Sequence, residues 1–133
     1  MNATYGMLIG SASLVILAGV AVMRDHPQAP DGASPAVLAL GDSVFHGKVG
    51  GALCYVCHGP AGKGVTGLGP NLTDKEWVNG DGTLAFIEKV VNEGVAKPKK
   101  MPAPMPPKGG GTLNDAQIKA AAAYVFSLSQ PKN

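Results

Sequence analysis

Apolar residues are distributed unevenly along the 133 residues of the chain, with one long run near the N-terminus and shorter periodic patterns after it. The run extends from Tyr5 to Met23 and contains no charged residue. As a helix, these nineteen residues would extend about 28 Å at roughly 1.5 Å per residue, close to the thickness of the hydrocarbon core of a bilayer. The pattern therefore predicts a transmembrane anchor in residues 1–23.

A cleaved secretory signal is the alternative interpretation of this run, with Gly19-Val20-Ala21 as a small-residue cleavage site. Such signals usually begin with a basic segment, whereas residues 1–6 contain no Lys or Arg. We therefore expect an uncleaved anchor. Residues 24–35 follow with three prolines and mostly polar neighbours, and they predict a flexible linker in which His26 is solvated.

Two helical patterns occur in the first part of the remaining domain, residues 36–133. Residues 36–46 have apolar side chains on one side, and Gly41 lies where a second backbone can approach closely. Residues 83–93 repeat apolar positions at helical spacing, and Gly94 ends the pattern.

A third helical pattern begins after Thr112-Leu113-Asn114-Asp115, which we interpret as a capping-box variant with an acid at the third position, and it continues to about Ser129. The preceding segment, residues 97–111, contains five prolines and excludes regular structure. Because no alternating β pattern is present, the sequence predicts an all-α domain.

Composition changes this picture in two ways. The chain contains 19 glycines and 11 prolines, so much of a small domain must be loop and little apolar surface is left to bury. A large flat cofactor would supply the missing core. The formal net charge of +2, without an aromatic and basic patch, gives nucleic-acid binding no support.

The motif Cys54-Tyr55-Val56-Cys57-His58 contains both cysteines of the chain. Two thiols at this spacing can each bond to a vinyl group of a haem, and the adjacent imidazole can bind the iron. We therefore predict one haem c, attached through Cys54 and Cys57, with His58 as an iron ligand. A redox dithiol would be expected in a βαβ pattern, and a structural zinc site would need a second pair of ligands.

Residues 39–128 resemble the class I cytochromes c of the small bacterial monohaem type. The resemblance depends on a set of features in the expected order: Gly41 and Phe45, the motif Cys54 to His58, Gly69-Pro70-Asn71-Leu72, Trp77, a Met-Pro segment and Tyr124. It implies three or four short helices around one haem, with the first and last helices crossing near Gly41, Phe45 and Tyr124. Ala121 departs from the family, which often has a larger aliphatic residue there, and this weakens the expectation of tight packing at the crossing.

The second iron ligand is expected to be a methionine, because a neutral thioether favours ferrous iron and raises the reduction potential. Met101 and Met105 both precede a proline. The segment Met105-Pro106-Pro107-Lys108-Gly109-Gly110 is more similar to the ligand loop of the family, so we predict Met105 as the ligand and Met101 as an apolar residue at the haem edge. His46 is too near the motif in sequence to be a second imidazole ligand, and we expect it on the surface.

Two further roles come from the resemblance. The carbonyl of Pro70 is expected to accept a hydrogen bond from His58 and to fix its ring. The indole of Trp77 is a candidate donor to a haem propionate, with simple packing as the alternative.

The predicted function is electron transfer without a catalytic site of its own. The chain would be a carrier or a subunit of a respiratory or photosynthetic complex, with its haem domain in the periplasm of a bacterium and its anchor in the inner membrane. Lys97, Lys99, Lys100 and Lys108 flank the ligand loop and would dock onto an acidic redox partner. The alternatives are a haem subunit of a periplasmic dehydrogenase, or a gas sensor or peroxidase with an open iron site.

Overall fold

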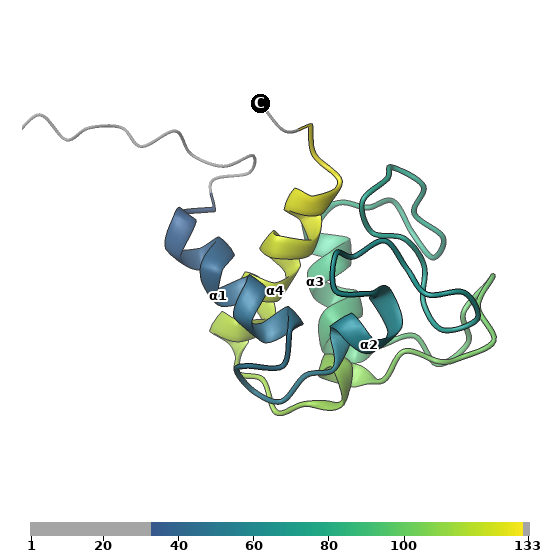
Figure 1. Ribbon diagram of the computed structural model, residues 1–133, viewed down its shortest axis with the longest axis horizontal. Coiled ribbons are helices and arrows are strands. Elements are labelled where there is room, and N and C mark those ends of the chain that lie inside the picture. Colours follow the sequence, from purple (N-terminus) through teal and green to yellow (C-terminus); the bar gives the residue numbers. More distant parts are fainter. Residues whose placement is uncertain (1–32, 132–133) are drawn as a thin grey trace, which may run out of the picture.

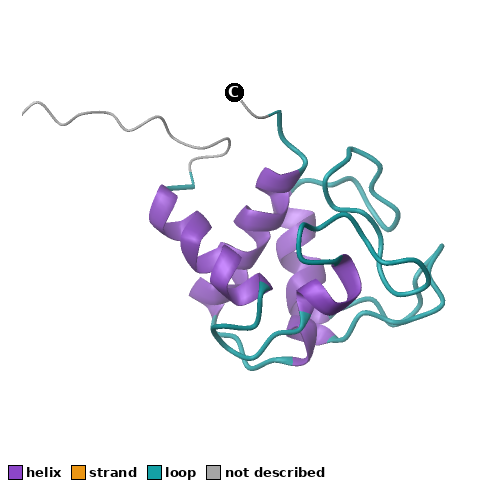
Figure 2. Ribbon diagram, viewed as in Figure 1, coloured by secondary structure: helices purple, strands orange, loops and turns teal. Residues whose placement is uncertain are grey.

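The computed structural model describes residues 33–131, which form short helices connected by long loops (Figures 1 and 2). The predicted anchor in residues 1–23 and most of the linker predicted in residues 24–35 lie outside the described residues. Within the described residues, no helix has the length and apolar character needed to cross a membrane.

The described part of the chain is helical, as its sequence pattern predicted. Between residues 33 and 131 there are no strands, and the two isolated β-bridges join Val65 to Gly69 and Val95 to Met105. The elements in chain order are α1 (Pro35–Phe45), α2 (Cys54–His58), α3 (Leu84–Glu93), the 3₁₀ turn η2 (Pro107–Gly110) and α4 (Asp115–Leu128). The first and last long helices therefore begin and end within a few residues of the expected positions.

Polar side chains at the N-termini explain where α1 and α3 begin. The hydroxyl of Ser34 accepts a hydrogen bond from the amide of Val37 at 3.3 Å. The hydroxyl of Thr83 accepts one from the amide of Phe86 at 3.2 Å. Each bond satisfies one of the amides that a helix leaves without an internal partner.

The cap of α4 differs from the predicted one. Asn114 and Gln117 form the capping box, in which each side chain accepts from the backbone amide of the other at 2.9 Å. The predicted cap, with Thr112 as its first residue and an acid at its third position, was wrong. The amide of Thr112 instead donates to the carbonyl of Gly50 at 2.8 Å, so the backbone at this residue is held by a distant loop rather than by the helix.

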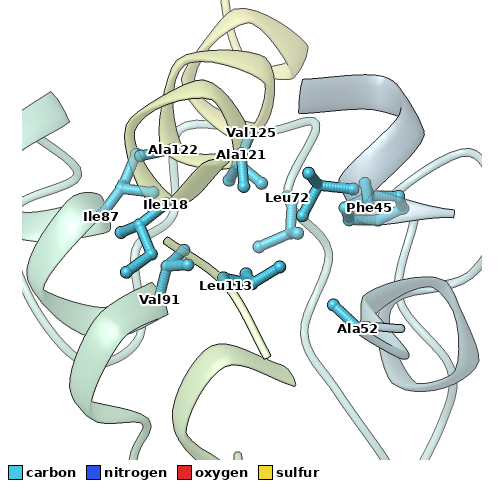
Figure 3. Close-up of a cluster of buried hydrophobic side chains, with 11 residues drawn as sticks. Phe45, Ala52, Leu72, Ile87, Val91, Leu113, Ile118, Ala121, Ala122 and Val125 are labelled. Carbon is cyan, nitrogen blue, oxygen red and sulfur yellow. The ribbon is translucent and has the colours of Figure 1, made fainter. Parts of the chain in front are cut away.

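Helices α1 and α3 both pack against α4 (Figure 1). Apolar side chains from these helices and from the loops between them form one buried cluster (Figure 3). Its members include Phe45, Ala52, Leu72, Ile87, Val91, Leu113, Ile118, Ala121, Ala122 and Val125.

Helices α1 and α4 meet backbone against backbone at Gly41. A Cβ atom at this position would overlap the carbonyl oxygen of Ala120 and would lie 2.6 Å from the Cβ of Tyr124. The rings of Phe45 and Tyr124 lie 5.4 Å apart beside this contact. The crossing is therefore where the resemblance implied, and Ala121, only 2% exposed, does not loosen it.

We expect the substitution Gly41→Ala to lower the free energy of unfolding by about 3 kcal/mol, because the added methyl group forces two backbones apart. Helix propensity alone would favour alanine by about 1 kcal/mol, so the two effects have opposite signs. Guanidinium unfolding curves measure the difference. Ala39→Val on the exposed side of α1 is the control and should change stability by only a few tenths of a kcal/mol. A stabilised Gly41→Ala variant would contradict the close crossing.

Candidate functional site

The motif from Cys54 to His58 forms α2, a single turn of five residues. Positions three and four apart share one face of a helix, so both thiols and the imidazole lie on the same side. All three side chains line one cavity of about 320 Å³. The sequence motif is therefore also a spatial cluster.

The cavity borders the buried apolar cluster. Several residues that line it also belong to that cluster: Phe45, Leu72, Ile87, Val91, Ala121 and Val125 (Figure 3). The walls are mainly apolar and come from α1, α2, α3, α4 and the loops around them. A mostly apolar cavity of this size with a few polar groups is typical of a cofactor site.

His58 is one of the polar residues that line the cavity, and it is only 8% exposed. Its Nδ1 atom lies 3.0 Å from the carbonyl oxygen of Pro70. Because a carbonyl can only accept, Nδ1 carries the proton and Nε2 keeps its lone pair in the neutral ring. Burial lowers the pKa of His58, with the hydrogen bond to Pro70 acting in the opposite direction. The imidazole is thus held neutral and in the tautomer that can bind a metal through Nε2.

The loop that follows α2 folds back on it. The amide of Gly64 donates to the carbonyl of His58, and the amide of Leu72 donates to that of Gly62, both at 2.7 Å. A Cβ atom at Gly69 would lie 2.7 Å from the carbonyl oxygen of Cys57, so only glycine allows this close approach. This contact brings the neighbouring Pro70 carbonyl to the ring of His58.

Neither alternative interpretation of the two cysteines fits the site. Both are free and half-buried, and burial raises the pKa of Cys54. A reactive redox dithiol instead needs a lowered pKa. No group of three or more His, Cys, Asp or Glu side chains that could hold a metal occurs among residues 33–131, so a structural zinc site has no second ligand pair there.

Met101 and Met105 both line the cavity. Their backbones differ, because Met105 exchanges two hydrogen bonds with Val95, at 2.8 and 3.0 Å. The described residues give Met101 no comparable backbone hydrogen bond. The position of Met105 is thus fixed against the end of α3, whereas that of Met101 depends on its proline-rich surroundings.

Comparison with known proteins agrees with this geometry. Residues 48–125 match the family model described as cytochrome c oxidase, cbb3-type, subunit III. The matched segment covers more than half of the chain and includes α2, the loop after it and both methionines. The chain belongs to this family.

Curated proteins that are similar to this chain are named as subunits of cbb3-type cytochrome c oxidases. The chain is 41% identical over 85 residues to the cbb3-type cytochrome c oxidase subunit CcoP of Rubrivivax gelatinosus, covering 63% of this chain and 25% of that protein. It is 41% identical over 80 residues to subunit FixP of Bradyrhizobium diazoefficiens, covering 59% and 25%. The chain therefore spans about a quarter of the length of these relatives.

A solved structure shows the same fold. Cytochrome CL from the marine methylotrophic bacterium Methylophaga aminisulfidivorans superposes with a TM-score of 0.51 at 22% sequence identity, covering 70% of this chain and 53% of that one. The likeness supports a cytochrome c fold for the described domain, which is the fold that the resemblance implied.

A c-type cytochrome domain requires a haem, and the residues of the cavity fit one. They include two thiols that could bond to its vinyl groups, a neutral imidazole that could bind its iron, two thioethers of which one could be the second ligand, and apolar walls for its ring. Trp77 also lines the cavity and is seated against Gly82, where a Cβ atom would overlap its indole ring. Its role toward a propionate stays a prediction.

Two placements in this cytochrome domain were not expected from sequence. The side chain of His46 is 24% exposed, and both of its ring nitrogens face backbone carbonyls, which the sequence did not predict. Three of the four lysines predicted to form one basic group lie on different segments of the chain. Lys97 and Lys99 border a small hollow beside α3, whereas Lys108 lies on η2, next to a hydrogen bond from the amide of Leu53 to the carbonyl of Gly109.

Proposed function

We propose that this chain carries one haem c and transfers single electrons as a membrane-anchored component of a respiratory complex of the cbb3-oxidase kind. The observation that carries the proposal is the shared cavity of Cys54, Cys57, His58 and Met105, in which the ring of His58 is oriented by Pro70. These groups are the donor set of a six-coordinate c-type haem.

Each group would have one role. Cys54 and Cys57 would form the two thioether bonds, His58 would bind the iron through Nε2, and Met105 would supply the second axial ligand. The haem, when bound, supplies a one-electron couple. The chain's own contribution is to hold the imidazole neutral, to present a thioether from a fixed backbone and to exclude water with apolar walls.

Membrane attachment and partner are inferred from the relatives and from the N-terminal run. The relatives are named as subunits of cbb3-type cytochrome c oxidases. A transmembrane anchor in residues 1–23 and a flexible linker in residues 24–35 would hold the haem domain, residues 36–133, at the periplasmic face of the inner membrane. The chain itself would pass electrons, and the chemistry would be performed by another subunit.

The alternative of a gas sensor or peroxidase with an open iron site is less well supported, because two thioethers line the cavity and one of them has a fixed backbone. The alternative of a haem subunit of a periplasmic dehydrogenase differs only in the partner. Copurification separates it from the oxidase proposal.

The experiment is to purify the tagged full-length chain from its own membranes in a mild detergent. We expect oxidase subunits to copurify and the reduced chain to be reoxidised by oxygen through them. Recovery of a dehydrogenase in their place would contradict the assignment to an oxidase. A chain that is recovered alone, and that the membranes do not reoxidise, would contradict the role in a respiratory complex.

The basic side chains around the ligand loop would assist docking. We expect the replacement of Lys97, Lys99, Lys100 and Lys108 with glutamine to lower the electron-transfer rate at low salt by on the order of tenfold and to flatten its salt dependence, since charge steering acts mainly on association. Stopped-flow kinetics at several salt concentrations measure both. The control replaces Lys48, Lys63, Lys75 and Lys119, which changes the net charge equally. An equal effect in both variants, or none in either, would contradict docking at the loop.

A further inference from the structure

His46 caps the C-terminus of α1 and is held from two sides. Its Nδ1 atom lies 2.9 Å from the carbonyl oxygen of Asp42 and 3.2 Å from a carboxylate oxygen of the same residue. Its Nε2 atom lies 2.8 Å from the carbonyl oxygen of Pro60, fourteen residues along the chain. Both ring nitrogens therefore face hydrogen-bond acceptors.

The protonation state of His46 follows from these partners. Carbonyl and carboxylate oxygens accept hydrogen bonds and cannot donate them, so each ring nitrogen must supply a proton. A neutral imidazole has one N–H group, whereas an imidazolium has two. Both contacts are complete only when the ring is protonated.

The contact with Pro60 reaches the loop that holds the backbone of His58. Within this loop, the amide of Gly62 donates to the carbonyl of Gly59 at 3.0 Å, and the amide of Gly64 donates to that of His58 at 2.7 Å. His46 thus joins the end of α1 to the segment that fixes His58 from behind.

We propose that His46 is a positioning residue, whose protonated ring cross-links the end of α1 to the loop behind His58, and that loss of a proton weakens this cross-link because one of the two contacts then lacks its N–H group. The cross-link consists of contacts within this chain, so it does not depend on which protein accepts the electrons. The positioning role rests on His58 being the iron ligand.

The groups around the ring favour its protonated, cross-linked form. The hydrogen bonds to Asp42 and Pro60 raise the pKa of His46 above 6.5, together with the Asp42 charge, while burial and Lys48 lower it. Helices α2 and α4 present two tyrosine rings, Tyr55 stacked at 6.1 Å and Tyr124 at 6.4 Å. The pKa of Tyr124 is raised to about 12 by burial and by a hydrogen bond to Asp42, so its hydroxyl is neutral.

The sign of the pH dependence follows from the raised pKa. A histidine whose pKa is higher in the folded than in the unfolded protein stabilises the fold fully below the unfolded value. That stabilisation is lost as the pH rises through the folded value. The cross-link should therefore weaken as the pH rises above about 6.5, the ordinary histidine value.

The first test is an NMR titration of the imidazole resonances in the haem-loaded full chain, with His46→Gln used to assign the His46 signal. We expect a midpoint above 6.5, the ordinary histidine value. Asp42→Asn should shift this midpoint down, and Lys48→Gln should shift it up. A midpoint at or below the ordinary value, or no response to Asp42→Asn, would overturn the proposal.

The second test measures the loop itself by amide hydrogen exchange, corrected for the intrinsic effect of pH. The amides of Gly64 and Leu72 should exchange faster above the midpoint, by roughly tenfold for each unit by which the pKa is raised. The amide of Ile118 in α4 is the control and should not respond. In His46→Gln the exchange of Gly64 and Leu72 should be independent of pH, and an unchanged pH response would contradict the cross-link.

The two proposals fail in different ways. A chain with no haem, or with different iron ligands, would contradict the proposed function. The titration midpoint of His46 and the amide exchange rates of Gly64 and Leu72 test the cross-link alone.

Discussion

The double substitution Cys54→Ala and Cys57→Ala should abolish covalent haem attachment and leave the domain without a stable fold. The cavity of about 320 Å³ interrupts the core, and core residues such as Phe45, Ile87 and Val91 line it. Without the haem ring these side chains lose much of their apolar contact. A domain of about 100 residues has little other core to compensate.

Mass spectrometry under denaturing conditions measures the attached haem, and circular dichroism measures the fold. Val56→Ala in the same motif is the control and should keep both, because Val56 offers no thiol and is 46% exposed. Single cysteine variants should keep one thioether bond. Haem that stays covalently attached to the double variant would contradict the assignment of both cysteines.

The second large effect is expected for Met105→Leu, which removes the thioether and keeps a side chain of similar volume. The iron should lose its low-spin spectrum, and the reduction potential should fall by on the order of 0.1 V or more, a part of the roughly 0.8 V that axial ligands span. Visible spectroscopy and redox titration measure the two quantities.

Met101→Leu is the matched control, since both methionines line the cavity and both precede a proline. It should keep the spectrum and shift the potential only slightly, because the backbone of Met105 is fixed by Val95. The reverse pattern, with Met101→Leu losing the low-spin spectrum, would assign the ligand to Met101.

Local sequence signals located the helices well and identified candidate site residues that line one cavity. The apolar periodicity of residues 36–46 and 83–93 reflects the side chains that face the core. The structure has α1 and α3 at these positions. The Cys54 to His58 motif is a single helical turn, so its spacing alone determines that three reactive groups share one face. The close contact at Gly41 was predictable because glycine destabilises a helix and is usually found there where a second backbone approaches closely.

Contacts between distant segments were beyond the reach of local patterns. The backbone of Thr112 is held by its hydrogen bond to the carbonyl of Gly50, and the ring of His46 contacts the carbonyl of Pro60. Neither contact leaves a periodic signal. The clustering of lysines in sequence likewise did not show that Lys97 borders the hollow beside α3 whereas Lys108 lies on η2.

The central claim is a covalently attached haem c bound by one imidazole and one thioether. Near-infrared magnetic circular dichroism of the oxidised full-length chain tests it most directly, because the charge-transfer band reports both axial ligands together. We predict the low-spin signature of histidine and methionine ligation. A bis-histidine or high-spin signature would contradict the account.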